Sequence, residues 1–141
     1  MIALGCDHGG YALMQEVIAW LEKNNYEYKN YGTYSEASVD YPEYGKKVAH
    51  AVADGECEFG ILICGTGIGM SMAANKVKGI RAAVCGDTFS ARATRAHNNA
   101  NILCLGQRVV GEGLALDIVD IWLTTKFEGG RHERRVNMIE E

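Results

Sequence analysis

A cysteine at the start of a glycine-rich turn is the feature of the sequence with the clearest chemical potential. Cys64 ends an apolar run, and Gly65, Gly67 and Gly69 follow it at alternate positions. Glycines adopt positive φ angles and let backbone N–H groups approach a ligand closely, so the turn is suited to an anion. Amide donors and a following helix N-terminus also favour the thiolate form of a cysteine. Two interpretations of Cys64 stay open on this pattern, a reactive group at a ligand site and a small buried thiol.

Three familiar ligand-binding loops are excluded by the residues of this turn. A dinucleotide fingerprint needs glycine where the sequence has Met70, and a thiol phosphatase loop needs arginine at the same position. A nucleotide P-loop needs serine or threonine after Lys76, where Val77 stands. The turn therefore either binds another kind of anion or serves packing between strand and helix, as other glycine-rich turns do.

Polar side chains elsewhere in the chain are candidates for the same ligand. Asp7 and His8 follow the first apolar run, where they are either site residues or turn formers. His97 stands at a predicted helix end, where it either takes part in the site or caps the helix dipole. Arg131 and Arg135 are four residues apart on a predicted helix, so both guanidinium groups face one side and suit a phosphate. The alternative for this pair is a solvated charged helix.

Strands that alternate with helices must position these groups. The five strand-like runs are MIALGC, YEYKNY, FGILIC, IRAAVC and NILCLG. Apolar residues recur at helical spacing in residues 12–24, 44–55, 69–77, 89–97 and 113–127, and a further helix is predicted after Gly130. The alternation predicts an α/β fold with an open five-stranded parallel sheet. Ligands of such sheets bind beyond the carboxyl ends of the strands, where Asp7 and Cys64 stand.

The bulk composition indicates a single domain over residues 1–141. The chain is 48% hydrophobic and carries a net charge of −4, which argues against a nucleic-acid partner. Its five cysteines form no C-x-x-C pair, so they indicate neither a disulfide framework nor a zinc site. No apolar stretch approaches the ~20 residues of a membrane span, and the N-terminus lacks a secretory signal pattern. We expect a cytoplasmic protein without a membrane partner.

Taken together, the ordered motifs resemble the ribose-5-phosphate isomerase B and galactose-6-phosphate isomerase family. The motifs run nearly end to end: GCDHGG, VDYP, ICGTGIGMSMAANK, GIRAAVC, HNNAN, LGQRVVG and EGGRHERRV. The resemblance implies a Rossmann-like three-layer sandwich. It also implies an aldose–ketose isomerase that works through an enediolate without a metal or cofactor. Homodimers or dimers of dimers with shared active sites are implied as well.

The retained motifs favour ribose 5-phosphate as the substrate. Galactose-6-phosphate isomerases of the family divide the motifs between two kinds of subunit, whereas this chain keeps all of them. The expected reaction is therefore the interconversion of D-ribose 5-phosphate and D-ribulose 5-phosphate. The alternatives are a six-carbon aldose phosphate (allose 6-phosphate or galactose 6-phosphate) and, from another class, a nucleotide- or phosphometabolite-binding module with an inert thiol.

The resemblance also implies roles for individual residues. It makes Cys64 the base that moves a proton between C2 and C1, and it makes the amides of residues 65–69 the donors to the enediolate oxygen. Some relatives carry a glutamate at the position of Ile68 and no cysteine, so this chain is of the thiol type. The catalytic residues implied are Cys64, Thr66, His97 for ring opening and Asp7. The substrate-binding residues implied are His8, Tyr41, Gly65, Gly67, Ile68, Gly69, Asn98, Arg108, Arg131 and Arg135, the arginines and Tyr41 at the phosphate. The segments that hold Asn98 and Arg108 are candidates to cross between subunits.

Overall fold

Strands and helices alternate along the chain in the computed structural model, which describes residues 1–141. The strands are β1 (Ile2–Cys6), β2 (Tyr28–Asn30), β3 (Phe59–Cys64), β4 (Ala82–Val84) and β5 (Ile102–Gly106). The helices are α1 (Tyr11–Lys23), α2 (Tyr41–Ala53), α3 (Ile68–Ala74), α4 (Thr88–Ala96), α5 (Glu112–Thr124) and α6 (Arg131–Ile139). Each predicted strand and helix is confirmed. Helix α2 begins earlier than its apolar pattern, at Tyr41, because Pro42 is well suited to a first helical turn.

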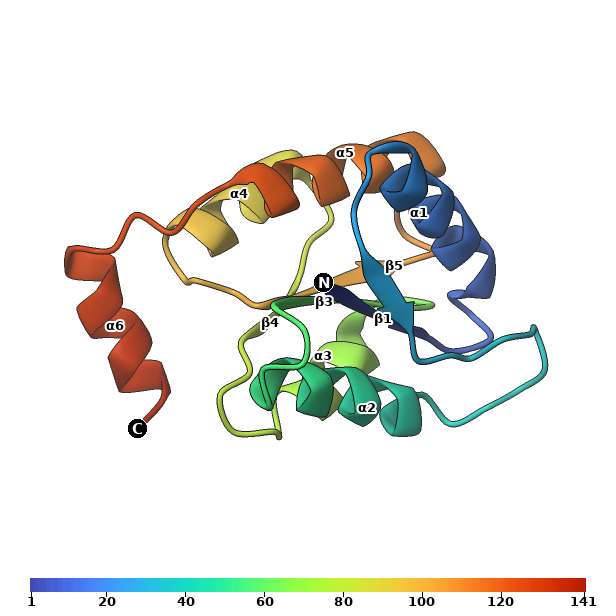
Figure 1. The fold of residues 1–141 in the computed structure, drawn as a ribbon, viewed down its shortest axis with the longest axis horizontal. Coiled ribbons are helices and arrows are strands. Elements are labelled where there is room, and N and C mark those ends of the chain that lie inside the picture. Colours follow the sequence, from blue (N-terminus) through green and yellow to red (C-terminus); the bar gives the residue numbers. More distant parts are fainter.

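The five strands form one parallel sheet in the order β2-β1-β3-β5-β4. Strands β1 and β5 are buried along their whole length, and β3 is buried after its first residue. Continuous burial is expected where helices cover both faces of a sheet. Helices α1, α4 and α5 lie on one face and α2 and α3 on the other (Figure 1). The predicted three-layer α/β sandwich is confirmed.

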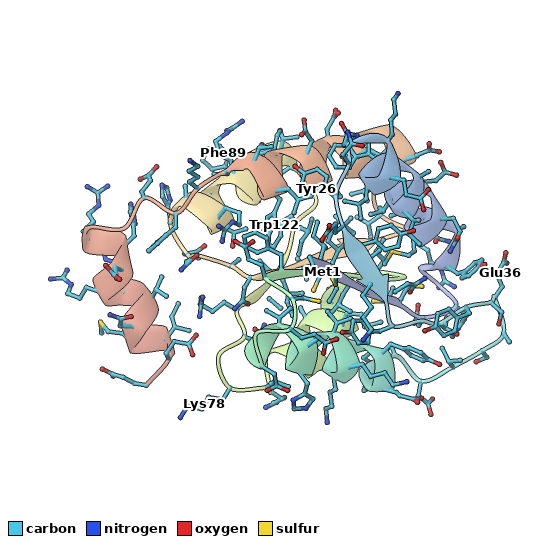
Figure 2. The ribbon with its side chains drawn as sticks, viewed as in Figure 1. Met1, Tyr26, Glu36, Lys78, Phe89 and Trp122 are labelled. Atoms are coloured by element: carbon cyan, nitrogen blue, oxygen red, sulfur yellow. The ribbon has the colours of Figure 1, made fainter.

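Large apolar side chains fill the space between the sheet and the helices. Trp122 of α5 is fully buried and meets the Phe59 ring edge-on, with 5.2 Å between the ring centroids. Figure 2 shows Trp122 between α5 and the sheet. On the opposite face, Val48 of α2 and Met70 of α3 are fully buried in a second apolar cluster. The two clusters fix both helical layers, and with them the strand ends that carry the candidate site.

Helix α6 lies apart from the three layers (Figure 1). Val136 is its one buried residue. None of the six helices has the length and apolar character to cross a bilayer. This outlying helix carries the paired arginines, Arg131 and Arg135.

Candidate active site

The glycine turn after β3 places an amide donor on the thiol. Cys64 is the last residue of β3, and the Gly67 N–H donates a hydrogen bond to Cys64 Sγ at 3.1 Å. Gly67 has a φ angle of +80°, and a Cβ atom built on it would lie 3.0 Å from the backbone of Leu105. Both constraints favour glycine at this position. A backbone donor on the sulfur is an arrangement that stabilises a thiolate.

Three of the other four buried cysteines have raised pKa values. Burial raises the pKa of Cys6 to about 12 and that of Cys85 to about 11, and it also raises the pKa of Cys104. Cys64 is the one cysteine whose sulfur accepts a hydrogen bond from a backbone N–H. The three cysteines with raised pKa values agree with the interpretation of small buried apolar residues.

Asp7 and His8 lie beside the glycine turn because β1 and β3 are neighbours in the sheet. The Asp7 N–H donates to the Ile63 carbonyl at 3.3 Å, and Asp7 Oδ1 accepts the Gly9 N–H at 2.9 Å. His8 Nδ1 accepts the Val39 N–H at 3.2 Å, so a neutral His8 carries its proton on Nε2. The pair therefore brings a carboxylate and an N–H donor to the edge where Cys64 stands.

Tyr41 and Arg108 reach the same turn from two other elements. The ring of Tyr41 lies 2.6 Å from a Cβ atom built on Gly69, so it occupies the space that a side chain there would fill. The Arg108 N–H donates to the Gly65 carbonyl at 3.0 Å, and the Arg108 side chain lies 3.5 Å from a Cβ atom built on Gly65. Of the two segments named as candidates to cross between subunits, the one with Arg108 thus contacts the thiol turn of its own chain.

Thr66 and Ile68 form the solvent side of the turn. Thr66 is exposed and its Oγ1 accepts the Ile68 N–H at 3.2 Å, while the Ile68 side chain is 50% exposed. A Cβ atom built on Gly106 would lie 2.6 Å from the Thr66 carbonyl, so β5 closes the other side of the turn. We call Asp7, His8, Tyr41, residues 64–69 and Arg108 the thiol half-site.

The remaining predicted residues, His97, Asn98, Arg131 and Arg135, lie elsewhere, and we call them the arginine half-site. His97 is the C-cap residue of α4, at the helix end that was predicted for it. A crossover helix runs antiparallel to the strands, so the C-terminal end of α4 lies near the amino ends of the strands. Cys64 stands at the other end of the sheet, where the strands have their carboxyl ends. Both arginines are exposed on α6, which begins after Gly130 as predicted. Figure 1 shows α6 and the end of α4 on the far side of the molecule from the loop that enters α2. One chain therefore does not bring the two half-sites together.

Two residues that the sequence analysis did not assign join His97 in the arginine half-site. The His132 ring stacks on the His97 ring, with 4.3 Å between centroids and 11° between planes. Glu128 Oε1 lies 3.9 Å from His97 Nε2 and 3.4 Å from His132 Nε2. The one sequence feature that could have indicated their contact is the four-residue spacing of Glu128 and His132.

Two imidazoles and a carboxylate are also a donor set that transition metals use. A bound ion lies in the plane of each ligating ring, and the two rings here are stacked nearly parallel. Their lone pairs cannot converge on one ion in this arrangement. The geometry is instead that of one carboxylate shared by two imidazoles.

Comparison with known proteins gives a consistent result over the whole chain. The family model described as Ribose/Galactose Isomerase matches residues 2–139. Ribose-5-phosphate isomerase B of Escherichia coli strain K12 is 53% identical over 138 residues, which cover 98% of this chain and 93% of that protein.

One solved structure and one relative with another substrate complete the comparison. The structure of Clostridium thermocellum ribose-5-phosphate isomerase B is 59% identical, with a TM-score of 0.98 over 99% of this chain and 94% of that one. A Pectobacterium atrosepticum protein named D-erythrulose-4-phosphate isomerase is 42% identical over 140 residues, which cover 98% of this chain and 91% of that protein. Proteins similar to this chain thus act on sugar phosphates of more than one length.

Proposed function

Because the chain belongs to the ribose/galactose isomerase family, it is a sugar phosphate isomerase, and we propose that it interconverts D-ribose 5-phosphate and D-ribulose 5-phosphate. Two of the relatives described above carry the name of this activity at more than half identity. The single observation that supports the chemistry best is the hydrogen bond from the Gly67 N–H to Cys64 Sγ.

The proposed reaction starts with proton removal by Cys64. The thiolate takes the proton from C2 of the open-chain aldose, and the electron pair forms the C1–C2 double bond of an enediolate, with negative charge on O1. The proton of the O2 hydroxyl then moves to O1, and the thiol returns its proton to C1 while C2–O2 becomes the carbonyl of the ketose. A positioned base contributes ~10²–10⁴-fold to such a step. Asp7, which is buried beside the turn, would hold the sugar hydroxyls that exchange protons.

The amides of residues 65–69 would stabilise the enediolate. Each preorganised donor to a developing oxyanion contributes roughly 3 kcal/mol in other enzymes. The turn is held in place from β5, since the Gln107 N–H donates to the Cys64 carbonyl at 2.9 Å and the Arg108 N–H to the Gly65 carbonyl at 3.0 Å. These two hydrogen bonds limit the reorganisation that the turn must undergo when charge develops.

The active site would combine the thiol half-site of one copy with the arginine half-site of a second copy. The sugar needs a base, a ring-opening group and a phosphate site within the length of one pentose phosphate. Within one chain these groups stand at opposite edges of the sheet. His97 would open the furanose ring with Asn98 beside it. Arg131 and Arg135 of the same copy would bind the phosphate together with Arg108 of the other. Such an assembly is a homodimer or a dimer of dimers.

The test is a coupled assay for ribulose 5-phosphate formation from ribose 5-phosphate, run with wild type, Cys64→Ala and the control Cys85→Ala. We expect Cys64→Ala to fold but to lose at least about 10³-fold in kcat, because it lacks the base. Cys85→Ala should keep wild-type kcat, because this thiol lies in the core with its pKa raised by burial. Continued solvent exchange of the C2 proton in Cys64→Ala would assign proton abstraction to another group.

A six-carbon aldose phosphate is the second candidate substrate. The family description names galactose beside ribose, and the D-erythrulose-4-phosphate isomerase shows that the substrate length differs among relatives. Comparison of kcat/KM for ribose 5-phosphate, allose 6-phosphate and galactose 6-phosphate decides between the candidates. A higher value for either hexose phosphate would replace the pentose assignment.

A further inference from the structure

The arginine helix α6 is attached to the rest of the chain at three places. Near its N-terminal end the His132 ring stacks on His97. In the middle Val136 is buried. At its C-terminal end Glu140 Oε1 accepts a hydrogen bond from Arg81 Nη1 at 2.8 Å. A nine-residue helix is marginal by itself, so its position depends on these attachments.

Arg81 connects the end of α6 to the segment that carries His97 and Asn98. While Nη1 donates to Glu140, Nε donates to the Asn99 carbonyl at 2.9 Å. The Arg81 and Glu140 side chains are only 18% and 31% exposed, so water screens the pair less than a surface ion pair. One planar guanidinium group thereby links the C-terminal end of the helix that carries the paired arginines to the loop that follows His97.

The position of Arg81 is itself fixed by the sheet. Its N–H donates to Asn101 Oδ1 at 2.8 Å, and its carbonyl accepts the Asn101 N–H at 3.0 Å. Arg95 holds the other side of the loop, because its Nη1 donates to Asn99 Oδ1 at 3.1 Å and to the Ala100 carbonyl at 2.6 Å. The loop is therefore anchored from both sides, whereas the C-terminal end of α6 has Arg81 as its ionic anchor.

We propose that Arg81, through Glu140, is a positioning residue that sets the distance between the phosphate-binding arginines and His97, and so selects the length of the sugar. This inference rests on the proposed function. One more carbon in the substrate adds a bond of about 1.5 Å between the reacting end and the phosphate. A misplacement of about 1 Å costs ~10²-fold in rate, so discrimination by length requires a rigid separation. Arg81 supplies that rigidity between two elements that a cleft of about 470 Å³ otherwise separates.

The experiment compares Glu140→Gln with wild type on ribose 5-phosphate, allose 6-phosphate and erythrose 4-phosphate. We expect the KM for ribose 5-phosphate to rise about fivefold, because the variant loses one contact that supports substrate binding. The kcat should stay within about twofold of the wild-type value. The preference for ribose 5-phosphate over allose 6-phosphate should fall by about fivefold. Amide hydrogen exchange should become faster in α6 and stay unchanged in β3.

Arg81→Lys separates the two contacts of the guanidinium group. A lysine keeps the charge opposite Glu140 but cannot donate in fork geometry to the Asn99 carbonyl as well. This variant should show the same relaxed length preference as Glu140→Gln. It should also lose about fivefold more activity on ring-closed ribose 5-phosphate than on the four-carbon substrate, because the His97 segment is released.

Glu56→Gln is the control, since Lys29 Nζ and Glu56 Oε1 are also 2.8 Å apart and neither residue belongs to either half-site. It should leave KM and the sugar preference unchanged. The proposal is overturned by an unchanged KM and preference in Glu140→Gln, by equal changes in the control, or by a uniform loss of kcat on every sugar.

If wild type isomerises no pentose phosphate, the proposed function is wrong. The positioning role is then decided by α6 exchange and by calorimetric affinity for inorganic phosphate, which should fall about fivefold in Glu140→Gln alone.

Discussion

Gly67 controls the position of the N–H that faces Cys64 Sγ. An alanine there would be strained by the φ angle of +80° and by contact at 3.0 Å with the Leu105 backbone. We expect Gly67→Ala to lower kcat/KM by at least about 10²-fold, because the amide moves away from the sulfur, and to lower the free energy of unfolding by about 1–3 kcal/mol. The assay above and a urea titration measure the two effects.

Gly113→Ala is the control for this substitution. Gly113 lies in α5 with no atom within 4 Å of a Cβ built on it, so alanine should leave activity unchanged and stabilise by about 0.5–1 kcal/mol. Wild-type activity in Gly67→Ala would mean that the amide on the sulfur is not needed.

At the residue scale, the sequence predicted which residues share one face of a helix. It did not predict which residues of different elements are in contact. Arg131 and Arg135 were predicted on one face of a helix because helical geometry alone decides that. The contact of the Tyr41 ring with Gly69 joins residues from two helices and depends on tertiary packing. The stacking of His132 on His97 depends on where α6 docks, which no local pattern indicates.

At the scale of elements, Asp87 caps the N-terminus of α4, the helix that carries His97 at its other end. Its carboxylate accepts the Ser90 N–H at 2.6 Å and the Ser90 Oγ–H at 2.9 Å, and these hydrogen bonds hold the pKa of Asp87 below its ordinary value of 3.8. A lowered folded-state pKa means that this stabilisation is complete above the ordinary pKa and is lost as the pH falls through the lower value.

Asp87→Ala should therefore lower the melting temperature by a few degrees at pH 7, and the difference from wild type should shrink toward about pH 2. Asp87→Asn keeps an oxygen acceptor for the cap, so it should lose less at pH 7 and show little pH dependence. Melting curves of the three proteins between these pH values check both expectations. A difference that stays constant down to pH 2 would mean that the charge of Asp87 is not involved.

The element types were predictable because the chain repeats a strong pattern. Strands β1, β3 and β5 are nearly continuous apolar runs that only a doubly covered parallel sheet buries in full. The strand order β2-β1-β3-β5-β4 and the docking of α6 were not predicted, because they follow from packing between elements far apart in sequence. The apolar pattern alone starts α2 too late, because its first turn, with Tyr41 exposed, adds no buried apolar residue, whereas Pro42 is the local signal that marks this first turn.

At the scale of the whole molecule, a shared site predicts complementation between two inactive variants. Cys64→Ala and His97→Ala homodimers should each be nearly inactive on ribose 5-phosphate, because every site lacks one group. A heterodimer of the two, isolated by two different affinity tags, has one site with both groups and one with neither. We expect about half of the wild-type activity per dimer.

The control for complementation is a chain that carries both substitutions, paired with wild type. Every site of that heterodimer lacks one of the two groups when the half-sites come from different copies, so it should be nearly inactive. The opposite result, an inactive first heterodimer and a half-active second one, would place Cys64 and His97 of one chain in the same site.

Cys64 ends β3, at the end of the sheet opposite to the one where α4 ends and α6 follows, and this separation has a consequence for handling the protein at low concentration. With the shared site proposed above, a monomer released by dilution would keep its folded core but would have no complete catalytic centre. Specific activity should then fall at protein concentrations below the dissociation constant of the dimer, without any unfolding. In the proposed site the substrate would contact both copies, so sugar phosphate should protect against this loss.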